Sequence, residues 1–187
     1  VNLAVSANGT LVYASGGSTG STQAVWVNRD GTTAPVDTTW DPQGTINSVS
    51  LSPDGKSLAV GLLRGTSQDI WVKQLPTGPS SRITFGDSAH FRASWSADGR
   101  SVLYITDRGP GAGLPYQSRA DGTGAPQMMA SSPMNFGHVI ESRDGRWLLL
   151  RRVIQEAGNG DIYGVKIGDT TVVPLLTSPA RETNPAV

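Results

Sequence analysis

The segment SPDGKSLAVG (residues 52–61) joins a tight-turn signal to an apolar strand. Asp54 and Gly55 tolerate positive φ, which a tight hairpin turn requires, and Pro53 presets the backbone just before them. The residues that follow, 57–61, are typical of a strand. The segment therefore predicts a β-hairpin whose turn is the S-P-D-G tetrapeptide.

The same pattern occurs four times. Tetrapeptides of this kind begin at Ser6, Ser52, Ser96 and Ser142, at spacings of 46, 44 and 46 residues. Each is preceded and followed by a short apolar strand, and an aromatic position and a last strand come later in the repeat. The strands before the turns are 3–5, 49–51, 93–95 and 139–141, and those after them are 10–14, 57–61, 101–105 and 146–150. The aromatics are Trp26, Trp71, Tyr116 and Tyr163, and the last strands are 34–36, 82–85, 127–130 and 172–176. We expect all four aromatics to pack between neighbouring units.

Four antiparallel strands in about 45 residues make a unit the size of one propeller blade. The predicted fold is an all-β propeller of four four-stranded antiparallel blades in a single domain, 1–187. The repeats cover 1–46, 47–91, 92–137 and 138–182, and an extra innermost strand covers 183–187. Because this last segment aligns with the start of the chain, two arrangements stay open, a closed four-bladed ring and a segment of a larger propeller. An open arc would expose an apolar blade face, so we expect closure or a partner that covers this face.

Composition excludes several function classes. Lys and Arg together number 15 and balance 15 Asp and Glu, and Cys is absent. Zero net charge provides no field that favours nucleic acid, and the Arg143, Arg146, Arg151 and Arg152 cluster has no interleaved aromatic residues. No apolar run is long enough for a transmembrane helix. We expect no nucleic-acid partner, no cofactor and no membrane span in these residues.

The second repeat resembles a known family. S-P-D-G, an apolar strand, D-I-W-V (69–72), a turn and R-I-T (82–84) are similar to the WD40-like repeats of TolB-type β-propellers. The stretches GTLVYASGG (9–17) and WVNRDG (26–31) are similar to the propellers attached to bacterial receptor-like Ser/Thr protein kinases. The resemblance covers the whole chain, but the third repeat has GLPY (113–116) where D-I-[WY] is expected, and Glu141 replaces a usual Trp. It implies the extracytoplasmic, periplasmic side of a bacterial cell envelope and protein partners that include membrane protein complexes.

Candidate ligand-binding residues lie just before or at the start of the innermost strands, which in propellers approach the mouth of the central channel. They are His90, Arg92, His138 and Asn184, with Glu182 nearby. Neither histidine has a partner at metal-ligand spacing, so we expect no metal site. A polar ring of mixed sign suits a small ligand or a peptide, and the alternative is ordinary hydrogen bonding within loops.

Candidate partner-binding residues lie in the connections between blades. Trp40, Met134 and Phe136 place bulky apolar groups there, and exposed aromatics and Met mark interfaces. The alternative is that some of these side chains belong to the core.

The sequence favours two functions. The first is a non-catalytic protein-binding scaffold that docks on or stabilises a larger, membrane-associated bacterial assembly. The second is an extracytoplasmic sensor module that binds a small ligand or peptide at the channel mouth. A hydrolase or lyase is disfavoured, because propeller enzymes need clustered His, Asp or Glu at the axis and this chain has 2 His.

Overall fold

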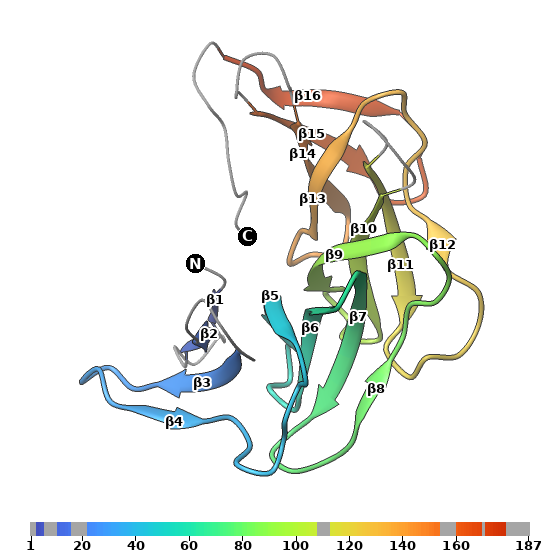
Figure 1. Ribbon diagram of the computed structural model, residues 1–187. Coiled ribbons are helices and arrows are strands. Elements are labelled where there is room, and N and C mark those ends of the chain that lie inside the picture. The colour runs from blue at the N-terminus through green and yellow to red at the C-terminus, as the bar shows by residue number, and fades with distance from the viewer. Residues whose placement is uncertain are drawn as a thin grey trace.

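A computed structural model describes residues 3–5, 11–15, 22–107, 113–153, 160–169 and 171–178. In these ranges the regular structure consists of β-strands, which form four four-stranded antiparallel sheets (Figure 1). The predicted all-β propeller architecture of four blades is confirmed. The extra innermost strand expected at 183–187 lies outside the described residues.

Each sheet is a meander in which strands pair in chain order from the innermost to the outermost. Sheet 1 comprises β1 (Leu3–Val5), β2 (Leu11–Ser15), β3 (Gln23–Val27) and β4 (Thr33–Pro35). Sheet 2 comprises β5 (Thr45–Leu51), β6 (Ser57–Arg64), β7 (Ser67–Gln74) and β8 (Ser80–Arg82). Sheet 3 comprises β9 (Ala89–Trp95), β10 (Ser101–Asp107), β11 (Gly113–Arg119) and β12 (Gln127–Met128). Sheet 4 comprises β13 (Phe136–Glu141), β14 (Trp147–Val153), β15 (Gly160–Lys166) and β16 (Val172–Leu176).

The repeated tetrapeptide forms the turn from the innermost strand to the next. In sheet 3 the Asp98 carboxylate accepts hydrogen bonds from the Ser96 hydroxyl at 2.7 Å and from the Arg100 backbone N–H at 3.0 Å. Gly99 has a φ of +68°, the left-handed conformation that favours glycine. The same serine–aspartate contact recurs at 2.6 Å in sheets 2 and 4. The tetrapeptide recurs because the turn needs its third residue as a hydrogen-bond acceptor and its glycine in the left-handed conformation.

The D-I-W and R-I-T segments of the second repeat are joined by one hydrogen-bond network. Asp69 on β7 is 4% exposed and accepts hydrogen bonds from Arg82 at 2.9 Å and from the Thr84 hydroxyl at 3.1 Å. The Thr84 hydroxyl accepts a 2.9 Å bond from the Ile70 backbone N–H. A buried carboxylate needs such partners, so these motif residues fasten the outermost strand to its neighbour.

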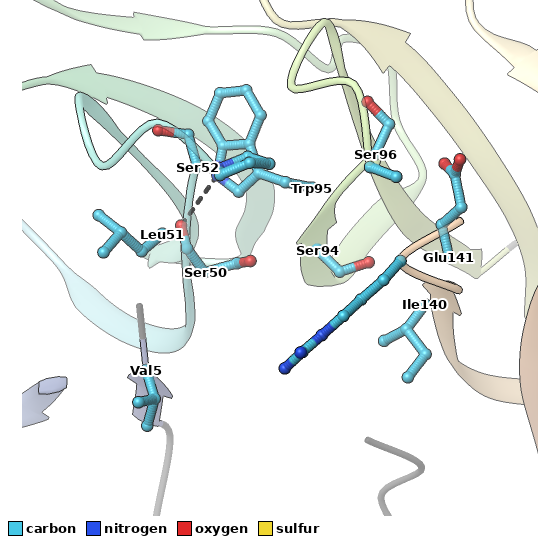
Figure 2. A pocket seen from close by; sticks show the side chains of 12 residues that line it. Val5, Ser50, Leu51, Ser52, Ser94, Trp95, Ser96, Ile140 and Glu141 are labelled. Carbon is cyan, nitrogen blue, oxygen red and sulfur yellow. Dashed lines mark hydrogen bonds between the residues drawn. The ribbon is translucent and has the colours of Figure 1, made fainter. Parts of the chain in front are cut away.

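Hydrogen bonds between sheets hold the innermost strands side by side. The Trp95 indole N–H donates to the Ser50 carbonyl at 2.9 Å, which joins β9 to β5 (Figure 2). The Ser94 hydroxyl donates to the Val139 carbonyl at 2.8 Å, which joins β9 to β13. The innermost strands of sheets 2, 3 and 4 are therefore directly linked across the blade boundaries.

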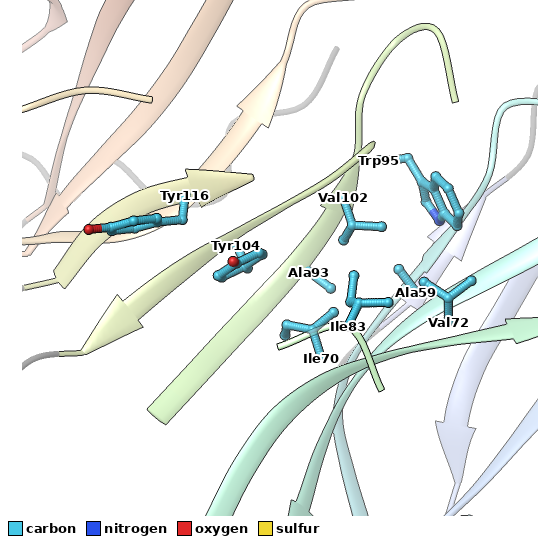
Figure 3. Close-up of a cluster of buried hydrophobic side chains, with 9 residues drawn as sticks. All are labelled: Ala59, Ile70, Val72, Ile83, Ala93, Trp95, Val102, Tyr104 and Tyr116. Atoms are coloured by element: carbon cyan, nitrogen blue, oxygen red, sulfur yellow. The ribbon is translucent and has the colours of Figure 1, made fainter. Parts of the chain in front are cut away.

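The core lies between consecutive sheets. Figure 3 shows the cluster between sheets 2 and 3, formed by Ala59, Ile70, Val72, Ile83, Ala93, Trp95, Val102, Tyr104 and Tyr116. Similar clusters fill the junctions of sheets 1 and 2 and of sheets 3 and 4. Each inner sheet buries apolar residues on both faces, as stacked blades must.

One predicted equivalence between repeats is wrong. In sheet 1, Trp26 lies opposite Val12, on the face that meets the following sheet. In the other sheets the aromatic residue lies opposite a residue on the face that meets the preceding sheet. These aromatic residues are Trp71, Tyr116 and Tyr163. Successive side chains of a strand alternate between faces, so a shift of one residue moves Trp26 to the opposite face. Trp26 and Trp71 consequently pack into the same cluster from two different sheets. The expected packing between blades is nevertheless present.

The two end sheets differ from the inner ones. In the described ranges, extensive packing joins consecutive sheets, and no comparable packing joins sheet 4 to sheet 1. Sheet 1 keeps Leu3 and Val5 51% and 58% exposed. Sheet 4 buries Leu148 and Leu150 against sheet 3, so Trp147 and Leu149, which alternate with them, lie on its other side. We call this side the open face of sheet 4.

Candidate functional site

A cavity of about 560 Å³ lies among the innermost strands and the turns that follow them. Sheet 1 contributes Val5, and Figure 2 shows this residue across the cavity from Ile140 and Glu141 of sheet 4. The remaining lining residues are Ser50, Leu51, Ser52 and Pro53 of sheet 2, Ser94, Trp95, Ser96 and Ala97 of sheet 3, and Arg143 of sheet 4. All four sheets thus contribute to one cavity, which lies where the innermost strands lead into the repeated turns. A volume of this size accommodates a small molecule.

The cavity wall combines hydroxyl groups with apolar surface. The Ser52 and Ser96 hydroxyls donate to Asp54 and Asp98 within their own turns, and the Ser94 hydroxyl donates to the Val139 carbonyl. The Ser52 and Ser96 hydroxyls each accept one backbone hydrogen bond, from Ser57 and Ser101. Because a hydroxyl oxygen carries two lone pairs, each of these serines keeps a lone pair for a further donor. The cavity can therefore hold a ligand that has both apolar surface and hydrogen-bonding groups.

Glu141 is the acidic residue of the cavity wall. It takes the place that Leu51 and Trp95 occupy in the preceding repeats, immediately before the repeat serine. Burial raises the pKa of its carboxyl group, a backbone hydrogen bond from Ala97 lowers it, and the charge of Asp98 raises it. The sequence analysis identified Glu141 only as a departure from the repeat pattern. The structure shows that Glu141 lines the cavity.

Arg92 and His138 lie at the other half of the innermost strands. Each stands four residues before its repeat serine, as does Ser48 of sheet 2. At or beside each of these positions, the pairing of the innermost strand with the next strand is irregular. The paired residues on the two sides of the irregularity are 46 and 48 in β5, 91 and 94 in β9, and 136 and 138 in β13. Arg92 itself has a φ of +63°. β-Bulges of this kind re-aim side chains and occur often beside functional sites.

His138 is held neutral at physiological pH. Burial is the largest cause that lowers its pKa, and together with the positive charges of Arg92 and Arg151 it brings the pKa to about 4. Arg151 is the direct partner of His138 in the β13–β14 ladder. Arg92 and His138, which the sequence analysis assigned to the channel mouth, are thus close enough to interact, and Arg151, which it assigned to a basic cluster, acts on His138 as well.

His90 takes a different position from the one that the sequence predicted. It is 6% exposed, its Nδ1 lies 3.2 Å from the Thr106 hydroxyl, and its ring meets Tyr104 edge-on at 5.4 Å between centroids. Tyr104 belongs to the core between sheets 2 and 3. His90 is therefore a core histidine rather than part of an open channel mouth. Asn184 and Glu182 lie outside the described residues.

The three candidate partner residues are buried to different degrees. Phe136 is fully enclosed in the core between sheets 3 and 4, so the expectation that its side chain is an accessible contact is corrected. The position follows a loop but already begins β13, whose alternation directs this side chain toward sheet 3. Trp40 and Met134 are partly buried and pack against the cores of their junctions.

In the described part of the chain, no group of three or more His, Asp or Glu side chains is placed to hold a metal ion. The same residues include no helix long and apolar enough to cross a bilayer.

Comparison with solved structures identifies the fold. The chain superimposes on TolB from Acinetobacter baumannii with a TM-score of 0.73 at 21% identity, covering 94% of this chain and 43% of that one. It superimposes on a putative TolB from Agrobacterium tumefaciens with a TM-score of 0.78 at 16% identity, covering 92% of this chain and 63% of that one. The chain has the fold of a TolB-like β-propeller. It spans about half the length of these relatives. No protein-family model matches the sequence, and no curated protein matches it.

TolB-like folds also occur in enzymes. An oligogalacturonate lyase from Vibrio parahaemolyticus superimposes with a TM-score of 0.64 at 12% identity, covering 93% of this chain and 53% of that one. Because one fold hosts unrelated functions, the likeness identifies architecture, and function must be argued from this chain's own surfaces.

Proposed function

We propose that this chain is a non-catalytic protein-binding scaffold that docks on a larger bacterial assembly through the open face of sheet 4. The observation that carries the proposal is the exposure of Trp147 and Leu175, at 36% and 48%. Leu103 and Ile105, on the corresponding face of sheet 3, are completely buried by sheet 4. Adjacent large apolar side chains at a surface are characteristic of interfaces.

The open face favours a flat, apolar partner. Gly164 lies between the two exposed side chains, because a Cβ built on it would be 3.0 Å from Leu175 Cδ1 and 3.4 Å from Trp147 Cε3. Leu149 is the ladder partner of Gly164 and extends the same surface. We propose that the occupant is a protein subunit that presents an apolar sheet face, as each inner blade does to its neighbour.

Three further assignments belong to this proposal. The likeness to TolB structures supports the extracytoplasmic side of a bacterial envelope as the location of the chain. We also propose that the partner is membrane-associated and that the repeats have the boundaries given in the sequence analysis. Trp40 and Met134, which are partly exposed, are proposed as additional contact residues.

The test compares the wild-type chain with the double variant Trp147→Ser/Leu175→Ser. The matched control is Phe85→Ser, because Phe85 is 66% exposed but lies in the connection between β8 and β9. Each protein is produced in a bacterial envelope and chemically cross-linked, and its mass and shape are measured by light scattering and small-angle X-ray scattering. We expect wild type and Phe85→Ser to give one adduct of defined mass and the double variant to give none. Equal urea midpoints of the three proteins would show that the difference does not come from unfolding. An adduct that persists in the double variant, or a wild-type chain that stays monomeric and uncross-linked, would contradict the proposal.

A second candidate function is the binding of a small ligand in the channel. The cavity among all four innermost strands favours it, because Ser50, Ser94 and Glu141 contribute polar groups there beside Trp95 and Ile140. Saturable binding of a small molecule, lost when Ser94→Trp fills the cavity, would support this function. A chain that binds no small molecule would exclude it.

A further inference from the structure

We propose that the cavity among the innermost strands binds a small molecule that carries a protonated amine on an apolar body, and that Glu141 is the counter-ion of this amine. The inference rests on the second proposed function, ligand binding in the channel, and names the charge that the ligand carries. It does not depend on docking at the open face of sheet 4.

The first argument is the place of the carboxylate in the repeat. The residue immediately before the repeat serine lines the cavity in each of the four sheets (Figure 2). These residues are Val5, Leu51, Trp95 and Glu141. Apolar side chains satisfy the fold at three of the four equivalent positions, so the architecture does not require a carboxylate at the fourth. The negative charge of Glu141 is therefore a property of the cavity rather than of the blade.

The second argument is that this carboxylate is held in place without a cation beside it. It accepts a hydrogen bond from the Ala97 backbone N–H. A Cβ on Gly145 would lie 3.3 Å from Glu141 Oε1 and 3.9 Å from the Ala97 Cβ, so the carboxylate lies between the turns of sheets 3 and 4. The ion pairs of the described ranges do not include Glu141, which is half-buried. A cationic ligand would stabilise this charge, because a carboxylate withdrawn from water needs a counter-ion.

The third argument is the hydrogen-bonding character of the wall. The hydroxyls of Ser52, Ser94 and Ser96 donate to other groups of the protein at distances between 2.6 and 2.8 Å. The Trp95 indole N–H likewise donates to the Ser50 carbonyl at 2.9 Å. These side chains therefore offer a ligand the lone pairs of their oxygens rather than donors. An ammonium group has three donors and no acceptor, so it complements a wall of hydroxyl and carboxylate oxygens.

The fourth argument concerns the rest of the wall. Arg143 is the other charged residue there, but it is exposed, so solvent screens its guanidinium group more strongly than the half-buried carboxylate of Glu141. Leu51, Trp95 and Ile140 provide apolar surface in the same cavity. An apolar body attached to the amine would be removed from water against these side chains. The cavity volume of about 560 Å³ accommodates such a molecule.

The test uses phenethylamine, phenethyl alcohol and phenylpropionate, which share an aromatic ring on a short alkyl chain and differ in charge. At neutral pH the amine is protonated, as a lysine side chain is. Binding to the wild-type chain, Glu141→Gln and the control Asp87→Asn is measured by NMR titration, with the Trp95 indole N–H resonance as the local reporter. Asp87 is an exposed carboxylate outside the cavity wall. Glutamine at position 141 keeps an acceptor oxygen for Ala97, and urea midpoints show that each variant is folded.

We expect phenethylamine to bind about tenfold more tightly than the alcohol or the acid, and to lose about tenfold in affinity with Glu141→Gln but not with Asp87→Asn. The comparison of the three probes needs the wild-type chain alone, so it holds even if a variant fails to fold.

Equal binding of the amine and the alcohol, unaffected by Glu141→Gln and abolished by Ser94→Trp, would overturn the amine site and leave channel binding intact. Tighter binding of phenylpropionate would also overturn it, because the wall would then favour an anion. Failure of all three probes would overturn the amine ligand, and failure of every other small molecule as well would overturn the channel function with it.

Discussion

The indole N–H of Trp95 and the backbone carbonyl of Ser50 form a hydrogen bond of 2.9 Å between residues that are 45 positions apart in the chain. The bond joins the innermost strands of sheets 2 and 3 at the wall of the cavity. The indole ring also belongs to the core of this junction. One side chain therefore both packs between the two blades and fixes the position of one innermost strand relative to the other.

Replacing Trp95 by Phe isolates the contribution of this hydrogen bond. The variant keeps an aromatic ring in the core but leaves the Ser50 carbonyl without its indole donor, so we expect a loss of about 1 kcal/mol in the free energy of unfolding. Trp95→Ala should lose about 3–5 kcal/mol, because it also creates a cavity. Urea unfolding followed by circular dichroism measures both. Trp147→Phe, at an exposed position, should change stability by less than about 0.5 kcal/mol, and an equal loss there would refute the role of the bond.

The turn glycine offers a second test, at Gly99. Its φ is +68°, and a Cβ there would meet only Pro53 at ordinary contact distances of 3.5 and 3.8 Å. Gly99→Ala should therefore lower the free energy of unfolding by about 1–2 kcal/mol through backbone conformation alone. Gly99→Asn should lose less, because asparagine tolerates the left-handed region. If alanine and asparagine cost the same, the conformational explanation is wrong.

The turn chemistry and the strand order of this fold could be read from the sequence, because both depend on local signals. This turn needs residues that are adjacent in the chain, and its signal occurs four times, with Asn8 in place of Asp in the first repeat. The face of Trp26 could not be read in the same way, since strand alternation makes the assignment sensitive to a shift of one residue. The sequence spacing from the repeat serine to the aromatic varies from 19 to 21 residues, so spacing alone did not settle it.

The candidate site was predictable only in part, for a related reason. The sequence analysis assigned Arg92 and His138, with His90 and Asn184, to the channel mouth because they lie just before or at the start of innermost strands. Arg151 joins them through the β13–β14 ladder, and Phe136 is buried because its alternation turns it toward sheet 3. His90 likewise depends on which face of β9 meets Tyr104. These are properties of the pairing register and the packing, which a single sequence specifies only weakly.

A buried ion pair that no local pattern indicated fastens the connection after β4 to sheet 2. The Lys73 ammonium lies 2.6 Å from the Asp37 carboxylate, and the two side chains are 2% and 1% exposed. Asp37 also accepts hydrogen bonds from the Thr39 backbone N–H at 2.8 Å and hydroxyl at 2.7 Å, and Lys73 donates to the Gly78 carbonyl. Removing one partner leaves a buried charge, so Lys73→Met should lower the free energy of unfolding by about 3–5 kcal/mol.

The same pair predicts a pH dependence of stability. The hydrogen bond from Lys73, followed by those from Thr39, lowers the pKa of Asp37 from 3.8 to about 2. Because the pKa is lower in the folded chain than in the unfolded one, the stabilisation is fully present above about pH 4 and is lost as the pH falls toward about 2. Urea midpoints measured between neutral pH and about pH 2 should therefore fall more steeply for wild type than for Asp37→Asn. The control is Asp87→Asn, because Asp87 is exposed and solvent screens its charge. If wild type and Asp37→Asn keep a constant difference in stability down to about pH 2, Asp37 does not bind to Lys73 as a carboxylate.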